Sequence, residues 1–272
     1  MIQMVMKPDD KDFKACLEDI RKAFNKRAFV NPDPLRFLYE YPDAEDREIC
    51  GMIASSLAFG RVDQILKAVD RVLCVMGKHP RHYIETSAFS DFDHDFENFQ
   101  YRFVKGRQVA EMCKGLKHVI RTFGSLNECF LEGFSQDHET VLPALSFMTA
   151  GILEHSAPGY LLALPEKGSA CKRSNLYLRW MVRNDDVDPG GWDGVSPSML
   201  VVPLDTHMHG ICRRLGFTDR RQADMKAALQ ATRVLRKIAP DDPVCYDFSL
   251  TRFGIHPDFD MNSLSRHFPD CS

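Results

Sequence analysis

Apolar residues recur every three or four positions over most of the chain, and this spacing predicts a protein built from helices. One such stripe, within residues 10–26, consists of Phe13, Cys16, Leu17, Ile20 and Phe24. The same spacing predicts further helices at residues 45–58, 62–77, 107–123, 125–134, 140–155, 169–183, 206–215, 220–238 and 243–253. Few segments alternate apolar and polar residues for long enough to form strands. Residues 85–100, rich in Asp, Ser and aromatics, predict an irregular segment.

This pattern predicts an all-α fold with two helical lobes and a cleft between them. We expect residues 1–44 and 156–272 to form one discontinuous lobe, and residues 45–155 to form a central helical-bundle lobe. The clearest long connection, residues 184–204, holds three Gly and three Pro. A connection of that length in a compact domain is usually functional or disordered.

The composition is that of an ordinary soluble globular protein, with 272 residues, 44% of them apolar and 27% charged. No apolar run approaches the ~18 residues of a membrane span, so we expect no membrane partner. The first residues lack the flanks of a signal peptide, which favours a bacterial-type cytoplasmic setting. The nine cysteines include no Cys-x-x-Cys pair, which predicts reduced thiols rather than a disulfide framework.

The net charge of −3 conceals an asymmetry along the chain. Residues 161–240 hold 13 Lys/Arg and 8 Asp/Glu, a net charge of +5, whereas the rest holds 22 and 30, a net charge of −8. A positive region on an acidic protein suits a polyanionic partner, although a solvated helical surface explains the charge equally well.

Lys172 lies in this basic segment, where a helix is predicted to begin. It follows Leu164-Pro165-x-x-Gly168, a turn in which Pro165 fixes φ and Gly168 permits a positive φ. The N–H groups and dipole of the next helix can then hold a phosphate, although any tight connection between helices needs a similar turn. A lysine is a nucleophile only as the neutral amine, and an ordinary lysine is protonated at neutral pH. Taken alone, Lys172 is therefore more simply interpreted as a solvated surface lysine.

Asp205 is predicted to cap the N-terminus of the helix that ends at Leu215-Gly216. An N-cap by itself contributes about 1 kcal/mol, by accepting hydrogen bonds from helix N–H groups. The same position also fixes an ionised carboxylate, which can stabilise a developing positive charge or activate a nucleophile. Residues 184–204 are long enough to bring the start of this helix back beside Lys172.

The sequences around both residues resemble one superfamily. The Leu-Pro-x-x-Gly turn, residues 172–178 (Lys-Arg-Ser-Asn-Leu-Tyr-Leu) and residues 204–216 (Leu-Asp-Thr-His-x-x-x-x-x-Arg-Arg-Leu-Gly) resemble the helix-hairpin-helix DNA glycosylases of the endonuclease III superfamily. The whole chain more closely resembles an uncharacterised bacterial family, a domain of unknown function, that is related to this superfamily. Residues 46–61 and 246–254 support the closer resemblance.

The resemblance implies a helix-hairpin-helix motif and a bifunctional DNA glycosylase/AP lyase that acts, as a nucleoid-associated monomer, on double-stranded DNA containing a damaged base. Lys172 matches the lysine that attacks the sugar and forms a Schiff base, and Asp205 matches the catalytic aspartate. The long separation of the two residues resembles that in archaeal 8-oxoguanine glycosylases, and an oxidised purine, especially 8-oxoguanine, is the expected base. No metal or redox cofactor is implied, and Cys271, the only cysteine after Gly254, cannot build an iron–sulfur cluster alone.

The resemblance also implies a DNA-binding surface and a pocket for the extruded base. The residues expected to bind DNA are Arg61, Lys167, Gly168, Ser169, Arg173, His207 and Arg213. Those expected in the base pocket are Phe59, Trp180 and Trp192. Plainer alternatives exist, because Arg61 can be an ordinary residue beside a helix and both Trp residues can belong to the core.

Two other functions fit the sequence. One is a helical protein that binds nucleic acid without catalysis. The other is a metal-dependent hydrolase that uses Asp205, His207 and His209, although residues two apart on a helix do not face each other.

Overall fold

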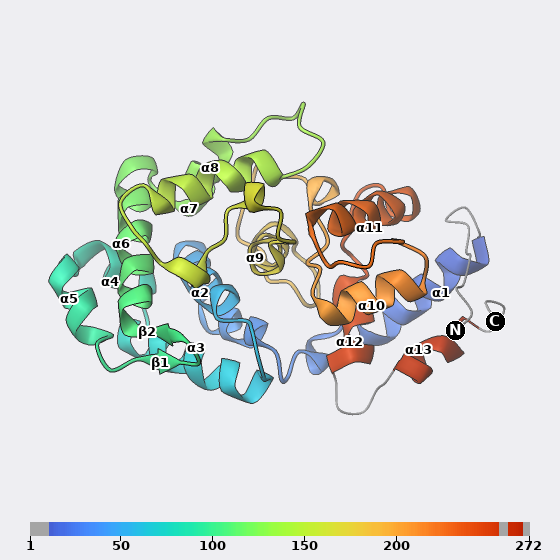
Figure 1. The fold of residues 1–272 in the computed structure, drawn as a ribbon, viewed down its shortest axis with the longest axis horizontal. Coiled ribbons are helices and arrows are strands. Elements are labelled where there is room, and N and C mark those ends of the chain that lie inside the picture. Colours follow the sequence, from blue (N-terminus) through green and yellow to red (C-terminus); the bar gives the residue numbers. More distant parts are fainter. Residues whose placement is uncertain (1–10, 256–260, 269–272) are drawn as a thin grey trace.

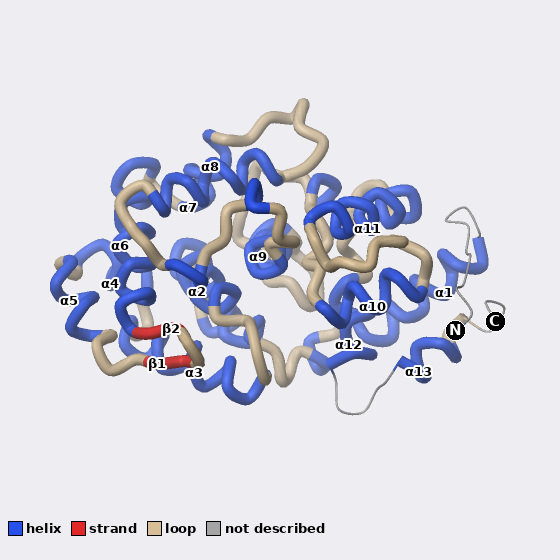
Figure 2. Tube along the Cα trace, viewed as in Figure 1, coloured by secondary structure: helices blue, strands red, loops and turns tan. Residues whose placement is uncertain are grey.

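The computed structural model describes residues 11–255 and 261–268, and their regular structure is almost entirely helical (Figures 1 and 2). The α-helices are α1 (Lys11–Phe24), α2 (Ala44–Ser56), α3 (Val62–Met76), α4 (Pro80–Thr86), α5 (Phe89–Asp95), α6 (Gly106–Phe123), α7 (Leu126–Glu132), α8 (Leu142–Leu153), α9 (Lys172–Val182), α10 (Thr206–Arg214), α11 (Met225–Ile238), α12 (Asp247–Ile255) and α13 (Met261–Arg266). Short 3-10 turns are η1 (Arg27–Phe29), η2 (Pro34–Glu40), η3 (Gly159–Leu161), η4 (Pro165–Lys167) and η5 (Pro197–Met199). Strands β1 (Gln100–Tyr101) and β2 (Val104–Lys105) form one antiparallel hairpin.

The predicted all-α class is confirmed, and each segment predicted to be helical contains an α-helix. The prediction of an irregular segment at residues 85–100 is wrong, because α5 lies within it. Asp91 accepts a hydrogen bond from the backbone N–H of Ala88 at 2.7 Å, and Phe92 is the helix's buried anchor. With so few turns, α5 has no apolar stripe long enough to recognise in the sequence.

α9 lies between two groups of helices, with α2 to α8 on one side and α1 and α10 to α13 on the other (Figure 1). Its residues Tyr177, Leu178 and Trp180 are fully buried. Gly51 on α2 allows a close approach, because a Cβ there would come within 3.2 Å of the Tyr177 ring. Burial of each such side chain contributes about 1.5–3 kcal/mol, so α9 is a fixed central element. The division into two lobes with the expected boundaries stays a prediction.

Residues 184–204, the return segment, connect the C-terminal end of α9 to the start of α10. The backbone N–H groups of Gly190 and Trp192 donate to the carbonyls of Trp180 and Met181 at 3.1 and 2.9 Å. The indole Nε1 of Trp192 then donates to Glu48 on α2 at 3.0 Å. These contacts hold the first half of the return segment against α9 and α2.

The described helices include none that combines the length and the hydrophobicity needed to cross a bilayer. The cysteines in the described residues are free thiols, in agreement with the absence of a Cys-x-x-Cys pair.

Candidate functional site

Lys172 and Asp205 meet where two helices begin. Lys172 is the first residue of α9, and Asp205 directly precedes α10. The Nζ atom of Lys172 lies 3.7 Å from Oδ2 of Asp205, and the two side chains are 27% and 31% exposed. The return segment therefore brings these residues together as expected, while their catalytic role stays a prediction.

The two carboxylate oxygens of Asp205 have different partners. Oδ1 accepts a hydrogen bond from the backbone N–H of Met208 at 2.9 Å, so the predicted N-cap is confirmed. Oδ2 faces the Lys172 amine. The cap fixes the orientation of the carboxylate, and the second oxygen remains available for charge stabilisation or proton transfer.

The turn before α9 has the backbone geometry that its sequence predicts. Gly168 has a φ of 79° and donates its N–H to the carbonyl of Pro165 at 3.1 Å. The Gly168 carbonyl accepts from the N–H of Met225 at 3.2 Å, which ties the turn to the start of α11. Because residues 154–171, with η3 and η4, separate α8 from α9, the helix-hairpin-helix motif itself stays a prediction.

Cys171 is the last residue before α9 and has a left-handed backbone, with a φ of 45°. The side-chain Nδ2 of Asn175 donates to the carbonyl of Ala170 at 3.0 Å and helps to hold this conformation. Burial raises the pKa of the Cys171 thiol, which keeps it protonated. The amine of Lys172 is more accessible to solvent than this buried thiol.

A cavity of about 550 Å³ contains the pair, and we call it the Lys172 cavity. Its volume is in the range of small-molecule sites. Its lining comes from segments far apart in sequence: Pro32, Asp33, Pro34, Ala58, Phe59, Gly60, Val62, Ile65, Tyr160, Lys172, Arg173, Leu176, Arg179, Pro203, Leu204, Asp205, Thr206, His207, Ala223, Asp247, Thr251, Arg252 and Ile255.

Two ion pairs contribute to the wall of the Lys172 cavity. Arg179 Nη1 contacts Oδ2 of Asp247 at 2.5 Å, and Arg252 Nη2 contacts Oδ2 of Asp33 at 3.1 Å. Both arginines are 3% exposed or less, so these charges are neutralised inside the wall. The Lys172–Asp205 pair is the more accessible charge pair of the cavity.

Phe59, Phe103, Tyr160 and Arg173 form a cluster beside the cavity, the aromatic rim. The rings of Phe103 and Tyr160 pack edge to face with centroids 4.6 Å apart, and Phe59 stacks on Phe103 at 5.5 Å. Arg173 lies over Tyr160 with its guanidinium carbon 4.4 Å from the ring centroid, and its Nη1 donates to the carbonyl of Ser56 at 2.6 Å. Phe103 and Tyr160 are 54% and 50% exposed, so the rim offers aromatic surface to solvent next to Lys172.

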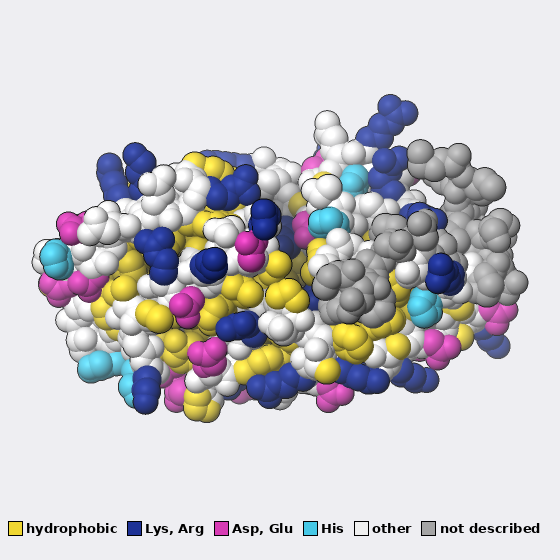
Figure 3. All heavy atoms as spheres, turned by 90° about the horizontal axis from the view of Figure 1, so that it is seen from below, with side chains coloured by type: hydrophobic (Ala, Val, Ile, Leu, Met, Phe, Trp, Pro, Cys, Tyr) yellow, Lys and Arg dark blue, Asp and Glu magenta, His cyan; other side chains and the backbone are white. Residues whose placement is uncertain are grey.

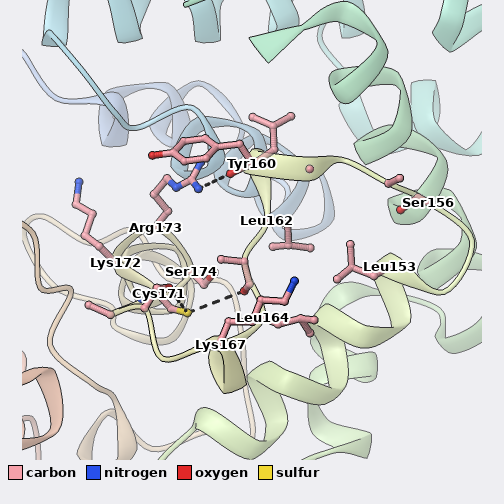
Figure 4. Close-up of a pocket in the computed structure, with 16 residues that line it drawn as sticks. Leu153, Ser156, Tyr160, Leu162, Leu164, Lys167, Cys171, Lys172, Arg173 and Ser174 are labelled. Atoms are coloured by element: carbon pink, nitrogen blue, oxygen red, sulfur yellow. Dashed lines mark hydrogen bonds between the residues drawn. The ribbon is translucent and has the colours of Figure 1, made fainter. Parts of the chain in front are cut away.

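A second cavity of about 640 Å³ shares Tyr160, Lys172 and Arg173 with the Lys172 cavity, and its lining also includes Lys167 and Ser169 (Figure 4). The picture shows the Arg173 guanidinium against the ring of Tyr160, and Lys172 extending away from Leu153. The predicted DNA-binding residues Lys167, Ser169 and Arg173 thus lie around one turn.

Gly60 lines the Lys172 cavity, and Arg61 follows it in the chain. Gly60 has a φ of 96°, and a Cβ there would come within 2.5 Å of the Arg102 guanidinium, so the turn requires glycine. The Arg61 side chain is 85% exposed and pairs with Asp63 at 3.2 Å. Arg61 therefore projects from the molecule next to the cavity without lining it.

Of the other expected site residues, some line the Lys172 cavity and others lie away from it. Trp180 and Trp192 are buried in the core around α9, and neither lines the Lys172 cavity, whereas Phe59 does. Arg213 is exposed in the last turn of α10, at the other end of that helix from Asp205. His207 lines the cavity, and the ring of His209 is instead bonded to the carbonyl of Arg220 at 3.0 Å.

The hydrogen bond between His209 and the Arg220 carbonyl weakens the metal-hydrolase alternative. In the part of the chain that the structure describes, Asp205, His207 and His209 do not converge as metal ligands.

The sequence did not identify Phe103 and Tyr160 as residues near the candidate site. The only available signal was an aromatic residue in each of two turns, and which aromatics are exposed depends on tertiary packing.

Comparisons with known proteins place the chain in a family. The sequence model of one family, described as "Protein of unknown function (DUF2400)", matches residues 33–256, most of the chain. Searches of curated proteins and of solved structures found no match. The expectation of an uncharacterised family is confirmed, and the relation to DNA glycosylases stays a prediction.

Proposed function

The chain belongs to that family of unknown function, and we propose that it is a DNA glycosylase with AP-lyase activity that uses Lys172 and Asp205. The observation that carries the proposal is the 3.7 Å approach of the Lys172 amine to the Asp205 carboxylate in the Lys172 cavity. The proposed partner is double-stranded DNA with a damaged base, and the proposed base is 8-oxoguanine. We propose that the protein acts as a cytoplasmic, nucleoid-associated monomer and that this reaction uses no metal or redox cofactor.

The proposed reaction requires one proton to leave the Lys172 ammonium. Oδ2 of Asp205 is near enough to take it with a small movement of either side chain, which generates the neutral amine. The amine attacks C1′ of a nucleotide rotated out of the duplex, and the bond from C1′ to the base breaks. The base leaves with the bonding electron pair and takes up a proton.

Asp205 then has a second role, because positive charge develops on the sugar as the base leaves. An ionised carboxylate whose orientation is fixed by the N-cap can stabilise that charge without reorganising. The adduct opens to an imine between Lys172 and C1′, and loss of a C2′ proton breaks the bond to the 3′ phosphate by β-elimination. Hydrolysis of the imine releases Lys172.

The surroundings of the pair support a nucleic-acid substrate. Exposed aromatic rings can stack on an unpaired base at about 1–3 kcal/mol per base, and the aromatic rim places two of them beside the cavity. Residues 161–240 carry the +5 charge given above, and the phosphate backbone attracts such a region. The face seen in Figure 3 carries exposed hydrophobic side chains with Lys and Arg among them, interspersed with Asp and Glu.

Borohydride trapping tests the proposal directly. An imine between Lys172 and DNA is reduced to a stable amine, so wild type is expected to form a covalent adduct with abasic and 8-oxoguanine duplexes. Lys172→Ala should form no adduct, and chelator should leave trapping unchanged.

Lys237→Ala is the matched control, because Lys237 is an exposed lysine of the same basic segment that lines neither cavity. It should trap like wild type. Duplex binding without trapping by wild type, or equal trapping by Lys172→Ala, would contradict the catalytic assignment; the first result would favour a non-catalytic nucleic-acid-binding protein.

A further inference from the structure

His118, Glu154 and His155 form a cluster that the proposed reaction does not use. His118 lies on α6, and the other two residues directly follow the end of α8. One ligand atom from each lies within 4.8 Å of the other two. The imidazole rings of His118 and His155 are edge to face with centroids 4.4 Å apart. Two imidazoles and a carboxylate are the ligands that Zn²⁺ and similar divalent ions prefer.

Packing between α6 and the end of α8 fixes the position of this cluster. Glu111, Gly115 and His118 are spaced along one face of α6. The Glu111 carboxylate accepts from the N–H of Ala157 at 2.9 Å. A Cβ on Gly115 would come within 2.5 Å of the carbonyl of Ile152, so only glycine permits this approach. Contacts earlier on the same face therefore hold His118 against the chain that carries Glu154 and His155.

The nitrogen–oxygen distances within the cluster are close to those around a tetrahedral ion. Ligand atoms at the usual 2.0–2.2 Å from Zn²⁺ lie roughly 3.4 Å from one another. Nε2 of His118 is 3.2 Å from Oε2 of Glu154, and Nε2 of His155 is 3.9 Å from Oε1 of the same carboxylate. Side-chain rotation alone can close this difference, because Glu154 and His155 are each 62% exposed. The partly negative C-terminal end of α8 adds attraction for a cation.

We propose that His118, Glu154 and His155 bind one Zn²⁺ ion, or a transition-metal ion of similar chemistry, with the fourth position open to water. The ion would join α6 to the start of residues 154–171, the connection that ends at Lys172. This proposal is independent of the proposed DNA chemistry, because the three residues lie outside the lining of the Lys172 cavity.

Competition with a chromophoric zinc chelator, on the full chain in a non-thiol reductant, measures the affinity. One equivalent of Zn²⁺ should bind to wild type, and His118→Ala and His155→Ala should each bind at least about tenfold more weakly, since even loss of a supporting contact costs 10–100-fold. Co²⁺ should give the absorption bands of a four-coordinate site, and Mg²⁺ should not compete.

His82→Ala is the matched control, because His82 is an exposed histidine on α4 outside the cluster, and this variant should bind like wild type. Zn²⁺ should also raise the Tm of wild type and of His82→Ala by several degrees but leave that of His118→Ala unchanged. Absence of binding by wild type, or undiminished binding by both His118→Ala and His155→Ala, would overturn the proposal; the second result would assign the metal to other groups such as the cysteines.

Discussion

The two ends of α9 both carry charge pairs, but the pairs differ in burial and in number of partners. At the N-terminal end, Lys172 and Asp205 are 3.7 Å apart and about a third exposed. At the C-terminal end, Arg179 and Arg183 are 3% exposed and share the fully buried carboxylate of Asp188. One helix therefore presents a loose, accessible ion pair at one end and a closed ionic network at the other.

The difference follows from desolvation. A buried ion pair is tolerated only when almost every charge has hydrogen-bonded partners, and once formed it is costly to break. An exposed pair contributes only about 0–1 kcal/mol, so it can be given up when a substrate offers other contacts. The network fixes the start of the return segment, and the pair at the other end of the same helix stays accessible to solvent.

Removal of Asp188 should produce the largest effect. Asp188→Ala leaves two buried guanidinium groups without their shared carboxylate, and we expect a loss of about 3–5 kcal/mol in the free energy of unfolding. Urea denaturation measures this loss. Asp186→Ala, an exposed change in the same segment, should cost less than about 0.5 kcal/mol. Equal effects of the two changes would show that the network does not hold the return segment.

The next largest effect is a dependence of the free energy of unfolding on pH, and it comes from Glu48. Its carboxylate is 2% exposed and accepts from Trp192 in the return segment, and burial raises its pKa from 4.5 to about 7. Between these values the folded protein keeps a proton that the unfolded chain has lost, so this contribution to stability is present below pH 4.5 and is lost as pH rises through 7. The decline should amount to about 3 kcal/mol.

Denaturation at several pH values measures this decline, and Glu48→Gln, which cannot ionise, should lack it. A wild-type stability that rises with pH over the same interval, with Glu48→Gln unchanged in slope, would show that Glu48 is ionised in the fold.

Asp205→Asn separates the N-cap of Asp205 from its charge beside Lys172, and it should have the smallest effect on stability. Asn is as good an N-cap as Asp, so the free energy of unfolding should change by less than about 0.5 kcal/mol. The charge facing Lys172 is lost, and the rate of trapping should fall about 10²-fold or more. Single-turnover trapping and denaturation of the same preparation measure both quantities. A fall in stability without a fall in rate would leave Asp205 as a cap alone.

The sequence predicted the elements that depend on local patterns. Stripes of apolar residues located the long helices, Gly168 marked a turn with positive φ, and Asp205 before Thr206 marked an N-cap. Each of these signals lies within a few residues of the structure it predicts. The approach of Lys172 to Asp205 was also accessible, because only the length of the return segment was needed to show that the two could meet.

Features that depend on contacts between distant segments could not be predicted in this way. Phe103 lies in a hairpin turn and Tyr160 in η3, and nothing local indicates that the two rings meet. Trp180 and Trp192 flank the site in sequence, but Trp180 lies on a buried face of α9 and Trp192 is bonded to Glu48 on α2, so both belong to the core. Exposure of an aromatic side chain is thus a property of the assembled fold.

The return segment has a further consequence for how this family can vary. It starts at one end of α9 and must return to the other, and its 21 residues, at up to about 3.3 Å each, can span several times the length of the helix, which is about 16 Å. One more turn in α9, about 5.4 Å, can therefore be accommodated by a straighter connection without added residues. Among relatives that keep the pair, the length of α9 should vary by a turn without a matching change in the length of the return segment.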